Sequence, residues 1–316
     1  MRLVFCGTPQ FAVPSLKYLL NQPEIEVAAV ITQPDRPKGR GQEISQSPVK
    51  QVALEAGVLV HQPPKIRAPE FQPVLEALAP DAIVIIAYGQ IIPARLLAIP
   101  KLGWINLHAS LLPKYRGAAP INWAIVNGET VTGITTMRID AGMDTGDMLL
   151  QQEISIGAKE TAPELAARMS EAGAPLMLKT LMGLQSGALQ PRPQDHQYAT
   201  MAPMLKKEDG RIDWNLSADQ IFNRMRGFTP WPGATTTFRG QSCQVWGQPS
   251  TEAESQKLPG PPGTIHTAMG KLSELSVVCG QGLLRVTEVR LEGRKQVSAT
   301  AFVNGAHLKV AEAFGG

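Results

Sequence analysis

Asn106 and His108 are the residues of this chain whose types and spacing point most directly to chemistry. They alternate with the apolar residues Ile105 and Leu107, so an extended strand would direct both polar side chains to one face. An amide donor beside an imidazole can stabilise the oxygen of a carbonyl group as that oxygen becomes negative. The spacing therefore predicts a polar pair that acts on one carbonyl substrate.

A carboxylate follows on a separate, glycine-rich segment, where Asp144 lies within the sequence DAGMDTGD at residues 140–147. On a loop, this carboxylate can orient the imidazole of His108, hold it in its charged form and accept a proton through water. Taken singly, His108 could equally be a core histidine and Asp144 a turn residue. Together with Asn106 they favour a catalytic site that requires neither a metal nor a cysteine.

Apolar periodicity predicts an α/β fold for the first part of the chain. Buried strands are expected at residues 2–6, 27–32, 82–87 and 103–108, and helices at 11–20, 48–57 and 159–186. This order is typical of a doubly wound, mostly parallel, Rossmann-like sheet, which binds ligands at the carboxyl ends of its strands. We expect the segment 140–147 to close over those ends. Gly7 lacks the further glycines of a GxGxxG pattern, which argues against a nicotinamide or flavin cofactor and a dehydrogenase.

Short strand-like runs separated by glycine-containing turns dominate the last third of the chain. A helix is expected at 218–226 and strands at 234–238, 243–247, 263–266, 275–280, 283–291 and 301–305, which predict a small antiparallel, OB-like β-barrel. A polar, proline-broken stretch precedes this part and indicates a linker. The predicted domains are therefore 1–189 (catalytic) and 209–316 (the barrel), joined by the linker 190–208.

The composition is that of an ordinary globular protein, with 43% hydrophobic and 18% charged residues in 316 positions. Cys6, Cys243 and Cys279 show no CxxC spacing, so we expect free thiols in a reducing compartment. The start of the chain lacks the apolar region of a signal peptide, and no apolar run reaches the ~20 residues of a membrane helix, so a cytoplasmic protein without membrane contact is expected. The net charge is +3, and the whole excess lies from Lys206 onward, which permits a nucleic-acid partner without requiring one.

Two long strings, NLHASLLPKYRGAAPINWAI from Asn106 onward and GITTMRIDAGMDTGD downstream, resemble the folate-dependent formyltransferases. Five further strings in the family's order extend the resemblance nearly end to end: VFCGTPQFAVPSL, QPDRPKGRG, IIAYGQIIP, KKEDGRIDW and FTPWPGA. The resemblance implies an enzyme that transfers the formyl group of its co-substrate, N10-formyltetrahydrofolate, to the α-amine of methionine esterified to initiator tRNA. Asn106, His108 and Asp144 would be its catalytic residues, no metal would take part, and the protein would act as a monomer.

The resemblance also implies two binding regions. The family's folate pocket maps onto Tyr88, Gly89, Gln90, Ile91 and Ile92, onto Ser110, Leu111, Leu112 and Pro113, and onto the loop 139–144 with Asp140. Main-chain groups there can bind the edge of the pterin while apolar side chains cover its flat face, although core packing would explain the two isoleucines equally well. The basic loop 32–50 is similar to the family's tRNA-reading insertion, so the expected tRNA contacts are Arg36, Lys38 and Arg40, with Lys206 and Lys207 on phosphates.

Two other classes of protein remain as alternatives. A formyltransferase acting on a small amine, such as glycinamide ribonucleotide or an amino sugar nucleotide, would share the Asn, His and Asp set but would not need a basic loop together with a basic barrel. A noncatalytic tRNA-binding protein would keep the basic features but would have no reason to hold Asn106, His108 and Asp144 in register.

Overall fold

The computed structural model describes residues 1–38, 43–250, 258–268, 274–309 and 312–315. The chain forms two compact units that are interleaved along the sequence. Unit 1 comprises residues 1–120, 131–155 and 164–203, and unit 2 comprises residues 121–130, 156–163 and 204–316. The domain boundaries inferred from sequence, 1–189, 190–208 and 209–316, stay a prediction.

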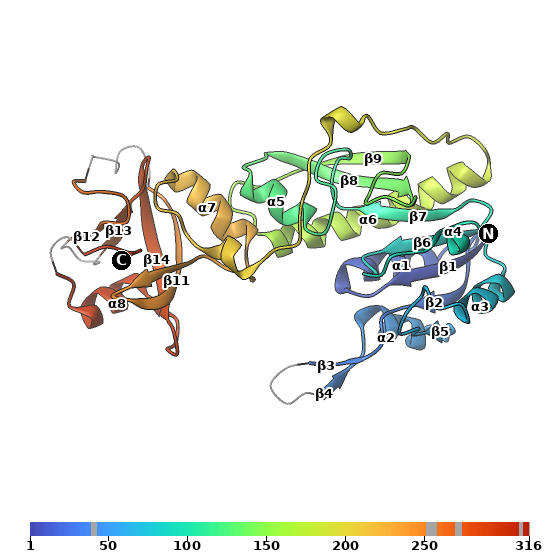
Figure 1. The fold of residues 1–316 in the computed structure, drawn as a ribbon, viewed down its shortest axis with the longest axis horizontal. Coiled ribbons are helices and arrows are strands. Elements are labelled where there is room, and N and C mark those ends of the chain that lie inside the picture. The colour runs from blue at the N-terminus through green and yellow to red at the C-terminus, as the bar shows by residue number, and fades with distance from the viewer. Residues whose placement is uncertain (39–42, 251–257, 269–273, 310–311, 316) are drawn as a thin grey trace. The chain divides into compact units, whose positions relative to one another are not determined.

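Unit 1 is built on a seven-stranded sheet with the order β5-β2-β1-β6-β7-β8-β9 (Figure 1). Its strands are β1 (Arg2–Gly7), β2 (Glu26–Ile31), β5 (Val60–His61), β6 (Ala82–Ile86), β7 (Trp104–His108), β8 (Val131–Arg138) and β9 (Met148–Ser155). The strands from β5 to β7 are parallel, whereas β8 and β9 are antiparallel to their neighbours. The mostly parallel α/β fold is thus confirmed. The chain leaves β1 toward β2 on one side and returns to β6 on the other, so the winding reverses between β1 and β6.

The described part of unit 1 has helices close to the predicted ranges 11–20, 48–57 and 159–186, and two further helices that were not predicted. They are α1 (Val13–Leu20) after the 3₁₀ turn η1 (Gln10–Ala12), α2 (Pro48–Glu55), α3 (Phe71–Leu78), α4 (Ala94–Leu97) and α6 (Ala162–Gln185), with a 3₁₀ turn η2 (His196–Tyr198). Helix α1 buries Val13, Leu16 and Leu19 at helical spacing. Helix α2 begins after Ser47, whose hydroxyl accepts a hydrogen bond from the main-chain N–H of Lys50. The expected loop 32–50 contains this helix start and a hairpin of β3 (Arg36–Lys38) and β4 (Glu43–Ser45), which the sequence patterns did not predict.

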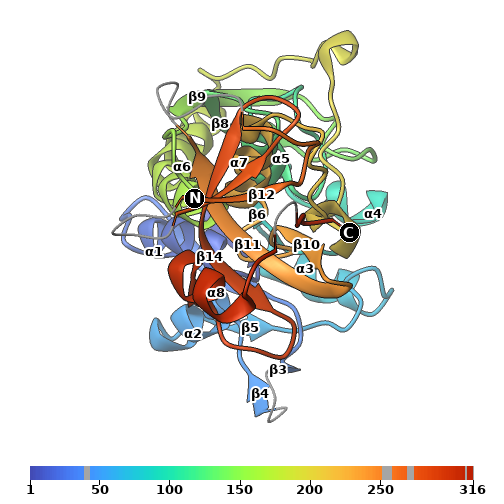
Figure 2. The ribbon, with the colours of Figure 1, turned by 90° about the vertical axis from the view of Figure 1, so that its left-hand side faces the viewer.

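Unit 2 contains an antiparallel sheet with the order β10-β11-β14-β13-β12, and β15 pairs with β14 (Figure 2). Its elements are α5 (Pro120–Val126), the 3₁₀ turn η3 (Lys207–Gly210), α7 (Ala218–Gly227), β10 (Thr235–Phe238), β11 (Gln241–Pro249), β12 (Ile265–Ala268), β13 (Glu274–Val278), β14 (Leu283–Leu291), β15 (Val297–Ser298) and α8 (Ala299–Ala306). Near the end of the chain, the main-chain N–H of Phe314 donates to Gly263 O and that of Gly315 to Thr237 O, both at 2.9 Å. This segment therefore joins the two edges of the sheet, in agreement with the predicted barrel.

The prediction of a strand at residues 301–305 is wrong, because this segment lies in helix α8. The hydroxyl of Ser298 accepts a hydrogen bond from the N–H of Ala301 at 3.2 Å and caps the helix. Ala299 and Phe302, three residues apart, are buried on one side. The cap and this spacing outweigh the strand propensity of Phe302 and Val303.

Helix α5 and the turn before α6 belong to unit 2 because they pack on α7. The side-chain amide of Asn122 donates to Gly227 O at 2.7 Å, and Trp123 meets the ring of Phe228 edge-on at 5.7 Å. The guanidinium of Arg226 donates to Gly157 O and Glu160 O at 3.3 and 3.1 Å. Burial lowers the pKa of Arg226, and the nearby charge of Glu160 opposes that effect.

Four aromatic side chains form the centre of the core of unit 2. Trp214 stacks on Phe314 with ring centres 5.8 Å apart, and Phe238 meets Phe302 and Phe314 edge-on at 5.1 and 5.7 Å. Phe314 is only 2% exposed. Phe314 therefore stabilises unit 2 in two ways. Its main chain joins the two edges of the sheet, and its side chain packs in the aromatic core.

We expect Phe314→Ala to lower the free energy of unfolding of unit 2 by ~3–5 kcal/mol, since it opens a cavity among buried rings. Amide hydrogen exchange of β11 and β14 in the native protein measures this change. The control is Val297→Ala, a side chain 38% exposed in the same unit, which should change the stability by less than ~0.5 kcal/mol. Equal exchange in the two variants would contradict the proposed role of Phe314.

Candidate active site

Asn106 and His108 lie on β7, as their alternation with Ile105 and Leu107 predicts. Residues two apart on a strand share a face, so the amide and the imidazole are directed to the same side of the sheet. His108 is 6% exposed and Asn106 is half-buried. The side-chain amide of Asn106 forms no hydrogen bond with any residue that the structure describes. Its N–H groups are therefore available to donate to a substrate.

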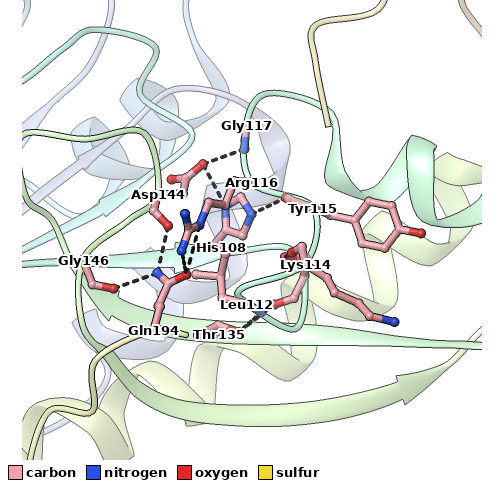
Figure 3. Close-up of polar contacts among 11 residues, drawn as sticks. His108, Leu112, Lys114, Tyr115, Arg116, Gly117, Thr135, Asp144, Gly146 and Gln194 are labelled. Atoms are coloured by element: carbon pink, nitrogen blue, oxygen red, sulfur yellow. Dashed lines mark hydrogen bonds and ion pairs between the residues drawn. The ribbon is translucent and has the colours of Figure 1, made fainter. Parts of the chain in front are cut away.

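The imidazole of His108 is fixed by a main-chain carbonyl (Figure 3). Its Nε2 lies 2.9 Å from the carbonyl oxygen of Tyr115. A carbonyl oxygen can only accept, so Nε2 carries a hydrogen, and Nδ1 is the ring nitrogen left for other partners. Nδ1 lies 3.6 Å from Oδ2 of Asp144, longer than a hydrogen bond of about 2.7–3.2 Å. The carboxylate thus faces the ring without a hydrogen bond to it, and Nδ1 is left available to a substrate.

The carboxylate of Asp144 is held by the main chain of the loop that follows β7. Its Oδ2 accepts a hydrogen bond from the N–H of Gly117 at 2.8 Å. Gly117 has φ +116°, and a Cβ there would lie 2.7 Å from the carbonyl oxygen of Ala202, so only glycine fits. Asp144 itself has φ +54°, an uncommon conformation for a residue with a side chain.

The loop that carries Asp144 starts at the end of the sheet opposite His108, which was not predicted. Because β8 runs antiparallel to β7, residues 139–147 begin beside the amino end of β7, where Ile139 N–H donates to Trp104 O at 2.9 Å. The loop then returns to bring Asp144 to His108 at the carboxyl end. A Cβ on Gly146 would lie 2.0 Å from Arg138 O, so this return also requires glycine.

The side chain of Gln194 binds the main chain of the loop that carries Asp144. No sequence pattern had indicated this residue. Its amide nitrogen donates to Asp144 O and Gly146 O, both at 2.8 Å, while its oxygen accepts from Nη2 and Nε of Arg116 at 2.7 and 3.1 Å (Figure 3). Gln194 is 5% exposed and Arg116 is 6% exposed. Residues 190–203, expected to be linker, thus run along unit 1, where Arg116 N–H donates to Thr200 O at 2.8 Å. Nothing in a polar, proline-broken stretch signals such a role.

A hydroxyl of β8 supports the turn that supplies the Tyr115 carbonyl. Oγ1 of Thr135 donates to Ser110 O at 2.6 Å and accepts from Leu112 N–H at 3.1 Å. The Ser110 hydroxyl in turn donates to Lys114 O at 2.6 Å. Ser110 and Leu112 therefore act in the structure as supports of this turn.

The residues expected to bind folate differ in what they can offer. Tyr88, Ile92, Ser110 and Leu112 are buried, Gln90, Leu111 and Pro113 are half-buried, and Gly89, Ile91 and Asp140 are exposed. Ile91 is 88% exposed, so its side chain and the main chain of Gly89 are free to contact a flat ligand. Both oxygens of the Asp140 carboxylate accept from the Thr145 hydroxyl, at 2.8 and 2.9 Å, so this residue braces its own loop. Within this set, the exposed apolar and main-chain groups are the ones accessible to a ligand.

The residues expected to bind tRNA are exposed where their side chains are described. Arg36 starts β3 and Lys206 and Lys207 lie at the start of η3; all three are exposed. Lys38 ends β3, and Arg40 lies outside the described residues.

The three cysteines are buried free thiols, as expected. Burial raises the pKa of Cys243 and Cys279 to about 12, which makes both poor nucleophiles. In the described parts of the chain, no three His, Cys, Asp or Glu side chains are grouped to hold a metal ion. None of the helices described there is long and apolar enough to cross a membrane.

Two known family models match this chain, one in its first part and one in its last part. The family model Formyl transferase matches residues 1–181, and the model Formyl transferase, C-terminal domain matches residues 204–307. The methionyl-tRNA formyltransferase of Solibacter usitatus is 53% identical over 315 residues, covering 100% of this chain and 99% of the relative. That of Acidobacterium capsulatum is also 53% identical, covering 98% of this chain and 97% of the relative.

Solved structures share the fold at low identity. HypX from Aquifex aeolicus in complex with tetrahydrofolic acid superposes with a TM-score of 0.63 at 18% identity, covering 99% of this chain and 48% of HypX. The N-formyltransferase from Helicobacter canadensis, in complex with folinic acid and dTDP-3-aminofucose, gives a TM-score of 0.64 at 18% identity, covering 93% of this chain and 99% of that one. A family model over more than half of the sequence and relatives 53% identical over nearly all of it agree with the resemblance seen in the motifs: the chain belongs to the formyl transferase family, among the methionyl-tRNA formyltransferases.

Proposed function

We propose that this chain is an enzyme that transfers the formyl group of N10-formyltetrahydrofolate to the α-amine of methionine esterified to initiator tRNA, giving N-formylmethionyl-tRNA for translation initiation. The observation that carries this proposal is 53% identity to a methionyl-tRNA formyltransferase over nearly the full length of both chains. The arrangement of His108, Asp144 and Asn106 supports it. We expect the enzyme to act in the cytoplasm, because its substrate is a charged tRNA. The monomeric state stays a prediction.

The reaction forms one C–N bond and breaks another. The α-amine attacks the formyl carbon, whose oxygen becomes negative, and collapse of this species breaks the bond to N10 of the folate. The amine loses a proton and N10 gains one. We infer that the Asn106 amide and the proton on Nδ1 of His108 stabilise the negative oxygen, because both groups lie on the same face of β7.

Asp144 has two roles in this scheme. Its carboxylate orients the imidazole of His108, whose Nδ1 lies 3.6 Å from Oδ2. It also accepts the proton of the attacking amine through water, since a free α-amine has a pKa of about 8 and is partly protonated near neutrality. The bond from Gly117 N–H keeps the carboxylate in place during both steps.

One assay tests the overall function. The protein is incubated with N10-formyltetrahydrofolate and charged initiator tRNA, the ester is hydrolysed, and the released methionine is weighed for a formyl increment. Parallel reactions contain glycinamide ribonucleotide or an amino sugar nucleotide as acceptor. Formylation of a small amine in place of methionine would overturn the proposed substrate.

We expect Asn106→Ala, His108→Ala and Asp144→Asn each to lower kcat by ~10²-fold or more with little change in KM, because these groups act mainly in the transition state. Asp144→Asn is chosen because an amide oxygen can still accept from Gly117 N–H, so only the charge is lost. Single-turnover kinetics measures the effect. Glu153→Gln, an exposed residue of β9, is the control. A folded variant with full activity would remove its residue from the mechanism.

Gln194→Glu tests whether the amide donors position Asp144. The new carboxylate can still accept from Arg116 but cannot donate to Asp144 O and Gly146 O. We expect kcat to fall by roughly tenfold or more, since small displacements of a catalytic group are costly. Gln190→Ala, an exposed glutamine of the same stretch, is the control and should keep wild-type kcat. Wild-type kcat in Gln194→Glu would mean that Gln194 only stabilises the fold.

We further propose that the first part of the chain, 1–189, carries catalysis and folate binding, and that residues 209–316 bind tRNA. The contacts to tRNA that we propose are Arg36, Lys38 and Arg40 in the segment 32–50, together with Lys206 and Lys207 at η3. Exposed cations attract phosphates regardless of sequence, so the lysine pair should bind all tRNAs alike.

Replacing Lys206 and Lys207 together by alanine should flatten the plot of log affinity against log salt by roughly one unit for each phosphate that the variant no longer binds. Filter binding of initiator tRNA over a range of salt concentrations gives the slope. The matched control is Arg294→Ala with Lys295→Ala, which removes two exposed cations from the turn before β15. The same slope change in both double variants would show that only net charge matters.

A further inference from the structure

We propose that residues 200–202, which we call the strap, position His108 and Asp144 for the reaction, and that Thr200 is the positioning residue of the strap; this inference rests on the function proposed above. The strap runs beside residues 115–117, and Met201 pairs with Arg116 as in a parallel sheet. Both segments belong to unit 1. The strap acts through the two peptide groups on either side of Arg116, because each of them bonds to the strap at one end and to a catalytic side chain at the other.

The first of these peptide groups joins Tyr115 to Arg116 and orients His108 (Figure 3). Its carbonyl oxygen, on Tyr115, lies 2.9 Å from Nε2 of His108. Its N–H, on Arg116, donates to Thr200 O at 2.8 Å. A peptide group is planar, so a bond that fixes its N–H also fixes the direction of its carbonyl. Bonds at the two ends of one peptide group also polarise each other, so the contact with Thr200 strengthens the bond to the imidazole.

The second peptide group joins Arg116 to Gly117 and orients Asp144 (Figure 3). Its carbonyl oxygen accepts from Ala202 N–H at 2.7 Å, and its N–H donates to Oδ2 of Asp144 at 2.8 Å. Ala202 is buried, and its own carbonyl accepts from Ala119 N–H at 3.1 Å. The strap therefore fixes the acceptor for the imidazole and the donor for the carboxylate together, and with them the 3.6 Å between Nδ1 and Oδ2.

The hydroxyl of Thr200 adds a contact that a substitution can remove. Its Oγ1 accepts from Tyr115 N–H at 2.8 Å, so Thr200 bonds the N–H groups on both sides of the Tyr115 Cα. Tyr115 has φ +60°, an uncommon conformation for a residue with a side chain. If Tyr115 relaxed to an ordinary conformation, its carbonyl would turn away from His108. The hydroxyl of Thr200 therefore helps to keep this carbonyl in place.

Thr200 is exposed, which separates its effect on orientation from its effect on stability. Loss of an exposed hydroxyl opens no cavity, so the fold of unit 1 should tolerate it. Other contacts remain: the side chain of Arg116 donates to Gln194 Oε1 at 2.7 Å and lies 3.1 Å from Nδ1 of His196. A slower reaction without the hydroxyl would thus reflect the orientation of the catalytic groups.

The test compares two substitutions of Thr200 in the full chain. Thr200→Val keeps the shape of the side chain but cannot accept from Tyr115 N–H, whereas Thr200→Ser can still accept. The control is Ser186→Ala, which removes an exposed hydroxyl that donates to Met182 O and Gly183 O elsewhere in unit 1. Circular dichroism and thermal unfolding check that each variant is folded.

The first measurement reports on the ring of His108 and needs no substrate. Exchange of its Nε2–H with water is followed by NMR in protein that contains isotope-labelled histidine. The chain has five histidines, so the His108 signal is assigned by its absence in His108→Gln. We expect exchange about fivefold faster in Thr200→Val than in the wild type, as loss of one hydrogen bond can provide. Equal exchange rates in Thr200→Val and the wild type would overturn the proposal.

The second measurement is formylation of charged initiator tRNA. We expect kcat of Thr200→Val to fall about fivefold with both KM values unchanged, because the hydroxyl acts on the catalytic groups and not on a substrate. Thr200→Ser and Ser186→Ala should keep wild-type kcat. Wild-type kcat in Thr200→Val, or an equal loss in Thr200→Ser, would contradict the role of this hydroxyl. A wild type that formylates only a small amine would overturn the proposed function, while the exchange measurement would still decide the role of Thr200.

Discussion

The catalytic arrangement depends on where one carboxylate oxygen is held. Oδ2 of Asp144 accepts from Gly117 N–H and faces Nδ1 of His108, while the Asp144 carbonyl accepts from Gln194. A residue with a side chain at φ +54° carries a cost of order 1–3 kcal/mol. Several hydrogen bonds on both sides of Asp144 offset that cost, and they come from segments that are 27 and 50 residues away in sequence. The site is thus a product of the tertiary fold rather than of one motif.

The two ring nitrogens of His108 serve different purposes because their surroundings differ. Nε2 is committed to a main-chain carbonyl, which does not titrate. Nδ1 faces the carboxylate and is left for contact with the substrate. The turn that supplies the carbonyl is itself secured by Thr135, so a hydroxyl inside the sheet contributes to the orientation of the ring. Mutations at such supporting positions act on the reaction without touching the substrate.

Features that depend on short stretches of sequence were predictable. The buried strands β1, β2, β6 and β7 were found from apolar runs, and the alternation around Asn106 and His108 placed both on one face. Helix α8 was missed because Phe302 and Val303 favour a strand when read alone, whereas the cap at Ser298 and the burial of Ala299 decide for a helix. Strand propensity is a weak guide wherever packing can override it.

Features that depend on distant contacts were not predictable. Gln194 acts on a loop 48 to 50 residues before it, and a polar glutamine near prolines has no periodicity that reveals its partners. Strand β8 and its antiparallel direction were not predicted, which is why the origin of the Asp144 loop was unexpected. The assignments of individual residues to folate and to tRNA come from the family resemblance and stay predictions.

The interleaving of the two units has a consequence for biosynthesis. Helix α5 leaves the ribosome early, but its partner α7 begins only at Ala218. At synthesis rates of roughly 5–20 residues per second, α5 waits several seconds with its packing surface uncovered. Co-translational folding of unit 1 therefore has to proceed around two segments, 121–130 and 156–163, that are completed last. For the same reason, no single cut of the chain yields two fragments that each contain one whole unit.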